Sequence, residues 1–99
     1  PLVDADDRLI GLITVKDIVK LQKHPNATKD GKGRLRVGVA IGVRPEDLQR
    51  AAACVQAGAD LLVLDVAHGH ADHALEVIRQ VKRRFPQVPL IGGNVATPE

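Results

Sequence analysis

The strongest candidate for chemistry in this sequence is an acid that follows a run of aliphatic residues. Leu61 to Leu64 are consecutive aliphatic residues, and Asp65 comes directly after them. Such a run predicts a strand of a parallel sheet that is covered on both faces. In α/β folds with parallel strands, ligands are held at the carboxyl ends of the strands. Asp65 is therefore a candidate ligand-binding carboxylate, with capping of the next helix or loop as the alternative.

Histidines and a single cysteine are the other residues that could carry chemistry. His68, His70 and His73 surround one loop, but a zinc site usually needs further ligands and a supporting shell of hydrogen bonds, and no convincing fourth group is present. We therefore predict no metal site. Cys54 lies in an apolar helical stretch without a base at a helpful position, which favours a small buried hydrophobe over a nucleophile.

The elements that would position Asp65 follow an alternating pattern of strands and helices. Strands are predicted at 35–41, 61–64 and 88–92, with helices that begin at Pro45 and at an N-cap Asp72. Right-handed crossovers would place the three strands side by side in parallel. A (β/α)8 TIM barrel needs about 250 residues. The sequence therefore predicts an α/β fold that contains about three βα units of a partial TIM barrel.

The segment before these units has a different pattern. Residues 2–4 and 9–13 predict two short strands joined by an acidic turn, and Thr14 is expected to cap a helix that runs to about Gln22. A hairpin and one helix cannot bury a core alone, so this segment needs a partner. Residues 23–34 are polar and contain two glycines, which predicts a flexible linker.

Composition excludes several classes of function. The 99 residues carry a net charge of +2 and one aromatic residue, so neither a basic footprint nor a stacking platform for nucleic acid is present. The apolar runs are far shorter than the roughly 20 residues that span a bilayer, and no membrane partner is expected. A single cysteine is compatible with a reducing cytoplasm. The chain begins without Met, and we expect it to be a segment of a longer protein.

Several motifs together resemble a known family. Gly11 to Ile18 resembles the closing strand and helix of a CBS motif, the half-unit of a Bateman regulatory module. The stretches 33–38, 64–70 and 92–97 are similar to the middle of inosine-5'-monophosphate (IMP) dehydrogenases. The resemblance covers nearly the whole chain. It implies that residues 1–22 are the C-terminal part of the second CBS motif, that 23–34 are a linker, and that 35–99 belong to the catalytic barrel.

The resemblance also implies roles for particular residues. In this family the position of Asp65 and the two that follow, Val66 and Ala67, border the NAD site, where a carboxylate can accept hydrogen bonds from both ribose hydroxyls. Neither Val66 nor Ala67 has a polar side-chain atom, although some family members carry hydroxyl residues at these positions, so contact here is expected through backbone and surface. Asn94 is expected to line the nicotinamide end of the site. The alternative for Asn94 is a loop residue that bonds its own backbone.

A second nucleotide site is suggested in the CBS-like segment. Thr14 and Asp17 match the Thr-x-x-Asp pattern with which CBS motifs hold an adenosine ribose and phosphate. The alternative is an ordinary helix cap with a solvated acid, and half a module cannot form the cleft by itself.

The resemblance implies an oxidoreductase. The full-length protein would oxidise IMP to xanthosine monophosphate through a cysteine that adds to the purine, with hydride passing to NAD. That cysteine loop lies outside this chain, so the segment would supply part of the NAD site and no catalytic group. A cytoplasmic homotetramer is implied, with a potassium ion whose ligands lie elsewhere. The alternatives are an adenine-nucleotide-sensing CBS segment and a GMP reductase, the latter disfavoured by the expectation that its barrel carries no CBS insertion.

Overall fold

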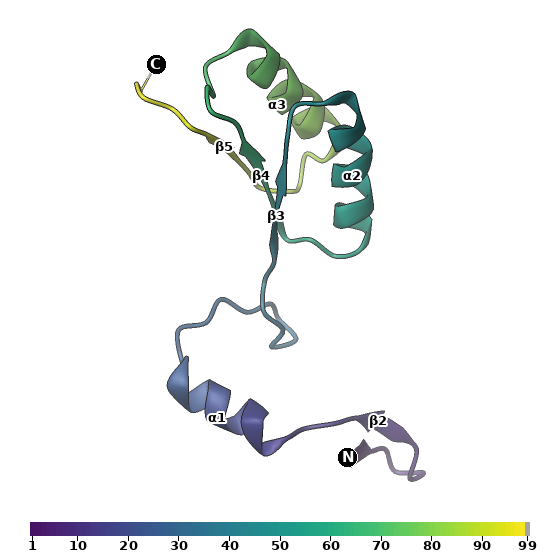
Figure 1. The fold of residues 1–99 in the computed structure, drawn as a ribbon. Coiled ribbons are helices and arrows are strands. Elements are labelled where there is room, and N and C mark those ends of the chain that lie inside the picture. The colour runs from purple at the N-terminus through teal and green to yellow at the C-terminus, as the bar shows by residue number, and fades with distance from the viewer. Residues whose placement is uncertain (99) are drawn as a thin grey trace. The chain divides into compact units, whose positions relative to one another are not determined.

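The structure, a computed structural model, describes residues 1–98. The chain divides into two compact units, Pro1–Leu35 and Arg36–Glu99. In the described residues, the first unit contains a two-stranded sheet and one helix, and the second contains a three-stranded sheet and two helices (Figure 1).

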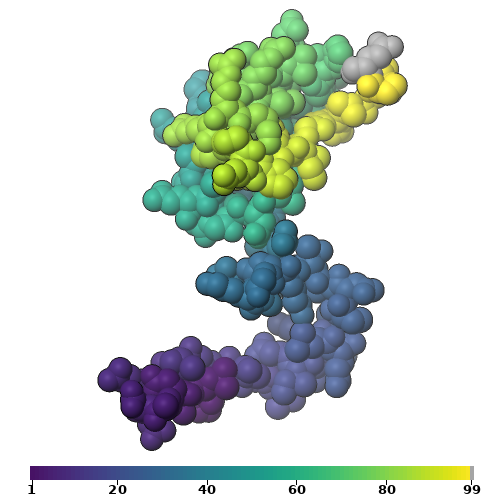
Figure 2. Space-filling model, turned by 180° about the vertical axis from the view of Figure 1, so that it is seen from behind, coloured from purple at the N-terminus to yellow at the C-terminus, as the bar shows by residue number. Residues whose placement is uncertain are grey.

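The first unit begins with a hairpin and a helix, as the sequence predicts. β1 (Leu2–Val3) and β2 (Leu9–Gly11) pair antiparallel. The Asp4 carboxylate holds the turn between them, because its Oδ1 accepts two backbone N–H groups at 2.9 and 3.0 Å. α1 (Val15–Lys23) follows. No side chain in residues 1–35, coloured purple to blue in Figure 2, is buried. The unit therefore has no core of its own.

A tight turn closes the first unit. Lys29 and Leu35 form an antiparallel bridge around it. Inside the turn, Oδ1 of Asp30 accepts the backbone N–H groups of Lys32 and Arg34 at 2.9 Å, and Oδ2 lies 2.8 Å from Nε of Arg34. The backbone hydrogen bond from Arg34 is the main cause that holds the pKa of Asp30 below its ordinary 3.8. The segment predicted as a linker therefore contains an ordered turn.

The second unit is built on a parallel sheet. β3 (Gly38–Ile41), β4 (Leu61–Asp65) and β5 (Leu90–Gly93) lie in the order β3-β4-β5, with every pair parallel. The spatial order of the strands is thus their order in the sequence. Crossovers of one hand then place successive helices on the same face of the sheet. This confirms the predicted α/β class with a parallel sheet.

Both helices of this unit cover one face of the sheet. α2 (Pro45–Gln56) and α3 (Asp72–Arg84) lie on the same side of the three strands (Figure 1). α3 approaches β5 closely, because a Cβ added to Gly92 would lie 3.2 Å from Cδ1 of Ile78. Within the described residues, seven buried residues from β3, β4 and both helices form a single core: Ile41, Ala51, Leu62, Leu64, Ala74, Val77 and Val81.

The aliphatic run of β4 is buried on one face only. Leu62 and Leu64 are 0% and 1% exposed, whereas Leu61 and Val63 are only half-buried. Side chains alternate along a strand, and both helices pack against the face that carries Leu62 and Leu64. The prediction of a strand covered on both faces is therefore wrong for this chain. Ile91 of β5, in register with Val63, is 55% exposed on the open face.

Some element boundaries differ from the predicted ones because backbone groups find other partners. The strand predicted from Leu35 begins at Gly38, since the Val37 N–H donates to Oδ2 of Asp60 at 2.8 Å. Asp72 is the first residue of α3, and the N-cap position is occupied by Ala71. Within the described part of the chain, no helix is both long and apolar enough to cross a bilayer.

Candidate functional site

The loops that follow β4 and β5 are joined by backbone hydrogen bonds. The Val66 N–H donates to the Gly93 carbonyl at 2.9 Å, and the Asn94 N–H donates to the Val66 carbonyl at 2.6 Å. The Gly69 N–H then donates to the Asn94 carbonyl at 2.7 Å. Parallel pairing of β4 with β5 brings the two loops together at the carboxyl edge of the sheet. The loop after Asp65 and the loop that contains Asn94 therefore form one surface.

Gly69 allows these loops to approach each other. Gly69 is buried, and a Cβ at this position would lie 2.8 Å from the Asn94 carbonyl oxygen and 3.1 Å from Cγ1 of Val95. Contacts this short with backbone do not occur for real Cβ atoms, so any side chain here would push the loops apart. A residue without a side chain is thus required where they meet.

The paired loops line an open hollow of about 350 Å³. Its walls come from both loops and combine small apolar side chains, imidazoles, a hydroxyl and an amide. The lining residues are Ala67, His68, Gly69, His70, Asn94, Val95, Ala96 and Thr97. The predicted Ala67 and Asn94 are therefore brought together here. Neither Asp65 nor Val66 is part of the lining.

Asp65 and Val66 take different positions beside the hollow. Asp65 is the last residue of β4, is in register with Gly93 of β5, and is exposed. Among residues 1–98 no hydrogen bond or ion pair engages its carboxylate, which leaves both oxygens able to accept. Val66 packs its side chain against the core, and both its backbone N–H and its carbonyl are engaged with the β5 loop. Val66 thus serves mainly to join the two loops.

A third loop lies at the same edge of the sheet. Gly42 to Arg44 connect β3 with α2, and Oδ2 of Asp47 accepts the Arg44 N–H at 3.0 Å. This loop also contacts α3, because Nε2 of His73 lies 2.8 Å from the Val43 carbonyl oxygen. A side chain from the first turn of α3 therefore contacts the β3–α2 loop.

The three clustered histidines have different environments. All three residues are exposed, but His73 is engaged with Val43, while His68 and His70 line the hollow. Within residues 1–98 there is no group of three or more His, Cys, Asp or Glu side chains placed to hold a metal ion. Cys54 is half-buried on α2, which is less than the full burial that the sequence predicts.

In the first unit, Thr14 and Asp17 form a capping box at the start of α1. Oδ2 of Asp17 accepts the backbone N–H and the hydroxyl of Thr14, both at 2.8 Å, and the Thr14 Oγ1 accepts the Asp17 N–H at 3.4 Å. The backbone hydrogen bond from Thr14 is the largest cause that lowers the pKa of Asp17 below 3.8. The two residues predicted to hold a nucleotide thus bond each other in this chain.

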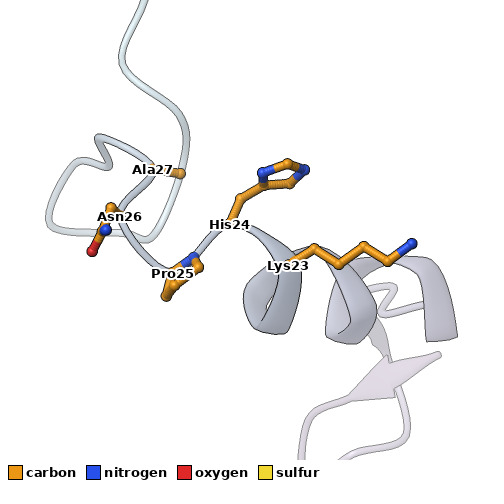
Figure 3. Close-up of a pocket in the computed structure, with 5 residues that line it drawn as sticks. All are labelled: Lys23, His24, Pro25, Asn26 and Ala27. Atoms are coloured by element: carbon orange, nitrogen blue, oxygen red, sulfur yellow. The ribbon is translucent and has the colours of Figure 1, made fainter.

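A second hollow in the first unit offers no converging groups. It measures about 380 Å³ and is lined by residues 23–27, around the C-terminal end of α1. Figure 3 shows that the side chains of Lys23, His24 and Asn26 point away from one another. Because a small-molecule site needs polar groups that converge on one point, we do not assign a ligand to this hollow.

Sequence reasoning missed most of the residues that line the hollow between the paired loops. All four of His68, Gly69, His70 and Thr97 lie in stretches that carry the family resemblance, but the two histidines were considered individually only as metal ligands, and Gly69 and Thr97 were given no role. Their nearness to Asn94 depends on backbone pairing between loops that lie 25 residues apart, as the Gly69–Asn94 hydrogen bond shows. The available signal was the shared position after two neighbouring parallel strands, where loops meet at one edge.

Comparison with known proteins identifies relatives of the whole chain. Residues 13–99 match the family model of the IMP dehydrogenase / GMP reductase domain. Inosine-5'-monophosphate dehydrogenase of Aquifex aeolicus is 54% identical over 99 residues, which are 100% of this chain and 20% of that protein. The enzyme of the same name from Nitrosopumilus maritimus is 48% identical over 97 residues, 98% of this chain and 20% of its own length. The chain spans about a fifth of these relatives.

A solved structure also resembles the chain. GMP reductase from Trypanosoma brucei, in complex with guanosine 5'-triphosphate, has a TM-score of 0.79 and 43% identity, over 98% of this chain and 23% of that one. That coverage leaves almost no part of residues 1–22 unmatched. The expectation that a GMP reductase lacks a counterpart of residues 1–22 is therefore wrong for this enzyme. The presence of residues 1–22 in the chain does not distinguish an IMP dehydrogenase from a GMP reductase.

Proposed function

The chain belongs to the IMP dehydrogenase / GMP reductase family, and from this we propose that it is the part of an IMP dehydrogenase that forms one side of the NAD site. The full-length protein would oxidise IMP to xanthosine monophosphate, with NAD accepting the hydride. The curated relatives support this choice, because those named above are IMP dehydrogenases at 54% and 48% identity, compared with 43% for the GMP reductase structure.

The observation that carries the proposal is the Asp65 carboxylate at the end of β4. It is exposed beside a hollow, and no group among the described residues occupies its oxygens. A pair of ribose hydroxyls supplies two donors, and an ionised carboxylate accepts both. The chemistry of the site therefore fits a nucleoside, and the parallel sheet presents it where ligands of α/β folds bind.

The other proposed cofactor residues contribute surface and orientation. Ala67 and Asn94 face the same hollow from different loops. We assign to the Asn94 amide a hydrogen bond near the nicotinamide end, and to Ala67 an apolar contact. Val66 would act through the position of its loop, since its backbone and side chain are engaged within the protein. No group in this chain is assigned to the chemical step.

The larger architecture is also part of the proposal. The open face of the sheet, which carries Val63 and Ile91, would line the interior of a closed (β/α)8 barrel formed with strands outside this chain. Residues 1–22 would complete a CBS motif, with 23–34 as the linker to the barrel. Among residues 1–98, the 14 exposed large hydrophobic residues lie mostly in residues 2–21, which supports a partner for that segment.

Membership of the family also leads us to expect a regulatory nucleotide, a potassium ion and a particular oligomeric state. Thr14 and Asp17 would take part in binding a regulatory adenine nucleotide once the CBS module is complete, and their capping box would then open or share its oxygens. We expect potassium to be required, with ligands outside this chain, and a cytoplasmic homotetramer. A CBS-type sensing segment is the alternative function for residues 1–22.

An assay of the full-length protein separates the two enzymes of the family. With IMP and NAD as substrates, we expect NADH to form, measured by its absorbance. The matched reaction supplies GMP with NADPH or NADH and monitors loss of the reduced cofactor. Oxidation of the cofactor with GMP, together with no NADH from IMP, would identify a GMP reductase and overturn the proposal.

A further inference from the structure

We propose that His73 is a positioning residue: it ties the first turn of α3 to the loop after β3 and thereby fixes the β4–α3 loop over the hollow. This inference rests on the function proposed above, because it names a residue that sets the geometry of the NAD site without contacting the cofactor.

The geometry of the contact defines its chemistry. His73 is the second residue of α3, and its Nε2 lies 2.8 Å from the carbonyl oxygen of Val43. A carbonyl oxygen can only accept, so the Nε2 of His73 must carry the proton and donate. The two residues are 30 positions apart in the sequence. The bond therefore joins two different βα units.

The acceptor belongs to a loop that is itself fixed. The Asp47 carboxylate accepts the Arg44 N–H at 3.0 Å, and a Cβ added to Gly42 would lie 2.8 Å from that same oxygen. Val43 packs its side chain against the core. The β3–α2 loop thus offers a carbonyl group whose position is set by its neighbours, which makes it a useful anchor for His73.

The start of α3 needs such an anchor. Its N-cap is Ala71, which has no side-chain acceptor, and no side-chain cap is present. Helix starts without a cap leave backbone N–H groups unpaired and are prone to fray. The β4–α3 loop is bonded to the β5 loop through Val66 and Gly69, but toward α3 its backbone bonds are local: Ala71 N–H to the His68 carbonyl at 3.2 Å, and the helix itself. His73 adds a long-range hydrogen bond to the packing of Ala74, which holds the same turn against the core.

Loss of the tie should therefore alter the hollow more than the core. His68 and His70, which line the hollow, lie between β4 and the first turn of α3. If that turn moves, these residues move with it. The core beneath, centred on Leu62 and Leu64, keeps its packing.

The test compares three substitutions in the full-length enzyme. His73→Ala removes the donor; His73→Gln retains an N–H at a similar reach; and His24→Ala in the first unit is the matched control. At saturating IMP, we expect His73→Ala to raise the KM for NAD threefold to tenfold, with the KM for IMP unchanged. His73→Gln should recover most of the loss, and His24→Ala should match the wild type.

The possible results separate this inference from the proposed function. Wild-type protein without IMP- and NAD-dependent activity would overturn the proposed function and this inference with it. Active wild type with an unchanged KM for NAD in His73→Ala would overturn the inference alone, whether or not the melting temperature falls. An equal rise of KM in the Ala and Gln variants would show that the donated hydrogen bond is not the cause, and would also overturn it.

Discussion

Asp65 and Thr14 illustrate how a polar group can be either engaged by its own chain or left open to a ligand. Thr14 is bonded through its backbone and side chain to Asp17. The Asp65 carboxylate has no such partner within residues 1–98 and stands at the end of β4, which is buried on one face. A carboxylate that caps a helix would be expected to bond backbone N–H groups nearby, and Asp65 does not. At the scale of single residues, Asp65 is thus the better ligand group.

Removing the Asp65 carboxylate should therefore impair use of NAD. A hydrogen bond to a charged group contributes about 1.5 to 3 kcal/mol, roughly a tenfold to hundredfold effect. We expect Asp65→Ala in the full-length enzyme to raise the KM for NAD by about that factor, with little change in IMP binding or melting temperature. Steady-state kinetics would measure the KM values for NAD and IMP, and thermal melts would measure the melting temperature. Asp6→Ala, which removes an exposed acid of the first unit, is the matched control. A lowered melting temperature with normal NAD kinetics would instead assign Asp65 to the fold.

A methyl group at Gly69 should separate the paired loops. Its Cβ would lie 2.8 Å from the Asn94 carbonyl oxygen, which already accepts the Gly69 N–H at 2.7 Å. Overpacking of this kind typically costs about 1 to 3 kcal/mol. We expect Gly69→Ala to lower the melting temperature and to weaken NAD use roughly tenfold. Gly31→Ala, where no atom lies within 4 Å of the added Cβ, should change neither. Equal behaviour of the two variants would contradict the proposed contact.

At the scale of elements, the helix α1 depends on its capping box. The pKa of Asp17 is held below 3.8 mainly by the Thr14 backbone N–H and next by its hydroxyl. Because this pKa is lower in the folded chain, the box contributes stability above the ordinary value and loses it as the pH falls through the lowered one. An NMR titration should place the Asp17 pKa below 3.8 and find it raised in Thr14→Ala. Thr28→Ala should leave the titration unchanged.

The turn around Asp30 should control cleavage of the segment that is predicted to be a linker. Its carboxylate holds Lys32 and Arg34, which are also trypsin sites. We expect limited proteolysis of the full-length protein to cut first within residues 26–34, and Asp30→Ala to speed cleavage after Lys32 and Arg34. Asp6→Ala, in the other turn of the first unit, is a control. Protection of this segment in both wild type and variant would argue against an exposed linker.

At the scale of the whole molecule, the chain should bind part of a cofactor without turning over a substrate. Its one cysteine, Cys54, lies inside α2 and is half-buried. The sheet leaves an open face with Ile91 55% exposed. We expect the isolated 99-residue chain to produce no NADH from IMP and NAD, in contrast to the full-length protein under the same assay. Measurable NADH production by the chain alone would place a catalytic group within it.

The sequence by itself determined the order and type of the elements, because those depend on local signals. The aliphatic run at 61–64 became β4, Pro45 began α2, and Thr14 capped α1, as predicted. Turn residues, caps and hydrophobic periodicity act over a few positions, so a reader of the sequence can find them. Asp65 was singled out as a candidate in the same way, because it ends the aliphatic run of β4, whereas Asn94 was a candidate only through the family resemblance.

Only the tertiary structure decided which groups meet. The one-sided burial of β4 follows from both helices packing on the same face. The pairing of Gly69 with Asn94, and of His73 with Val43, joins residues 25 and 30 positions apart. No local pattern encodes these contacts, because they arise only when parallel strands align and bring their following loops to one edge. The same pairing occupied the Val66 backbone and left the Asp65 carboxylate open.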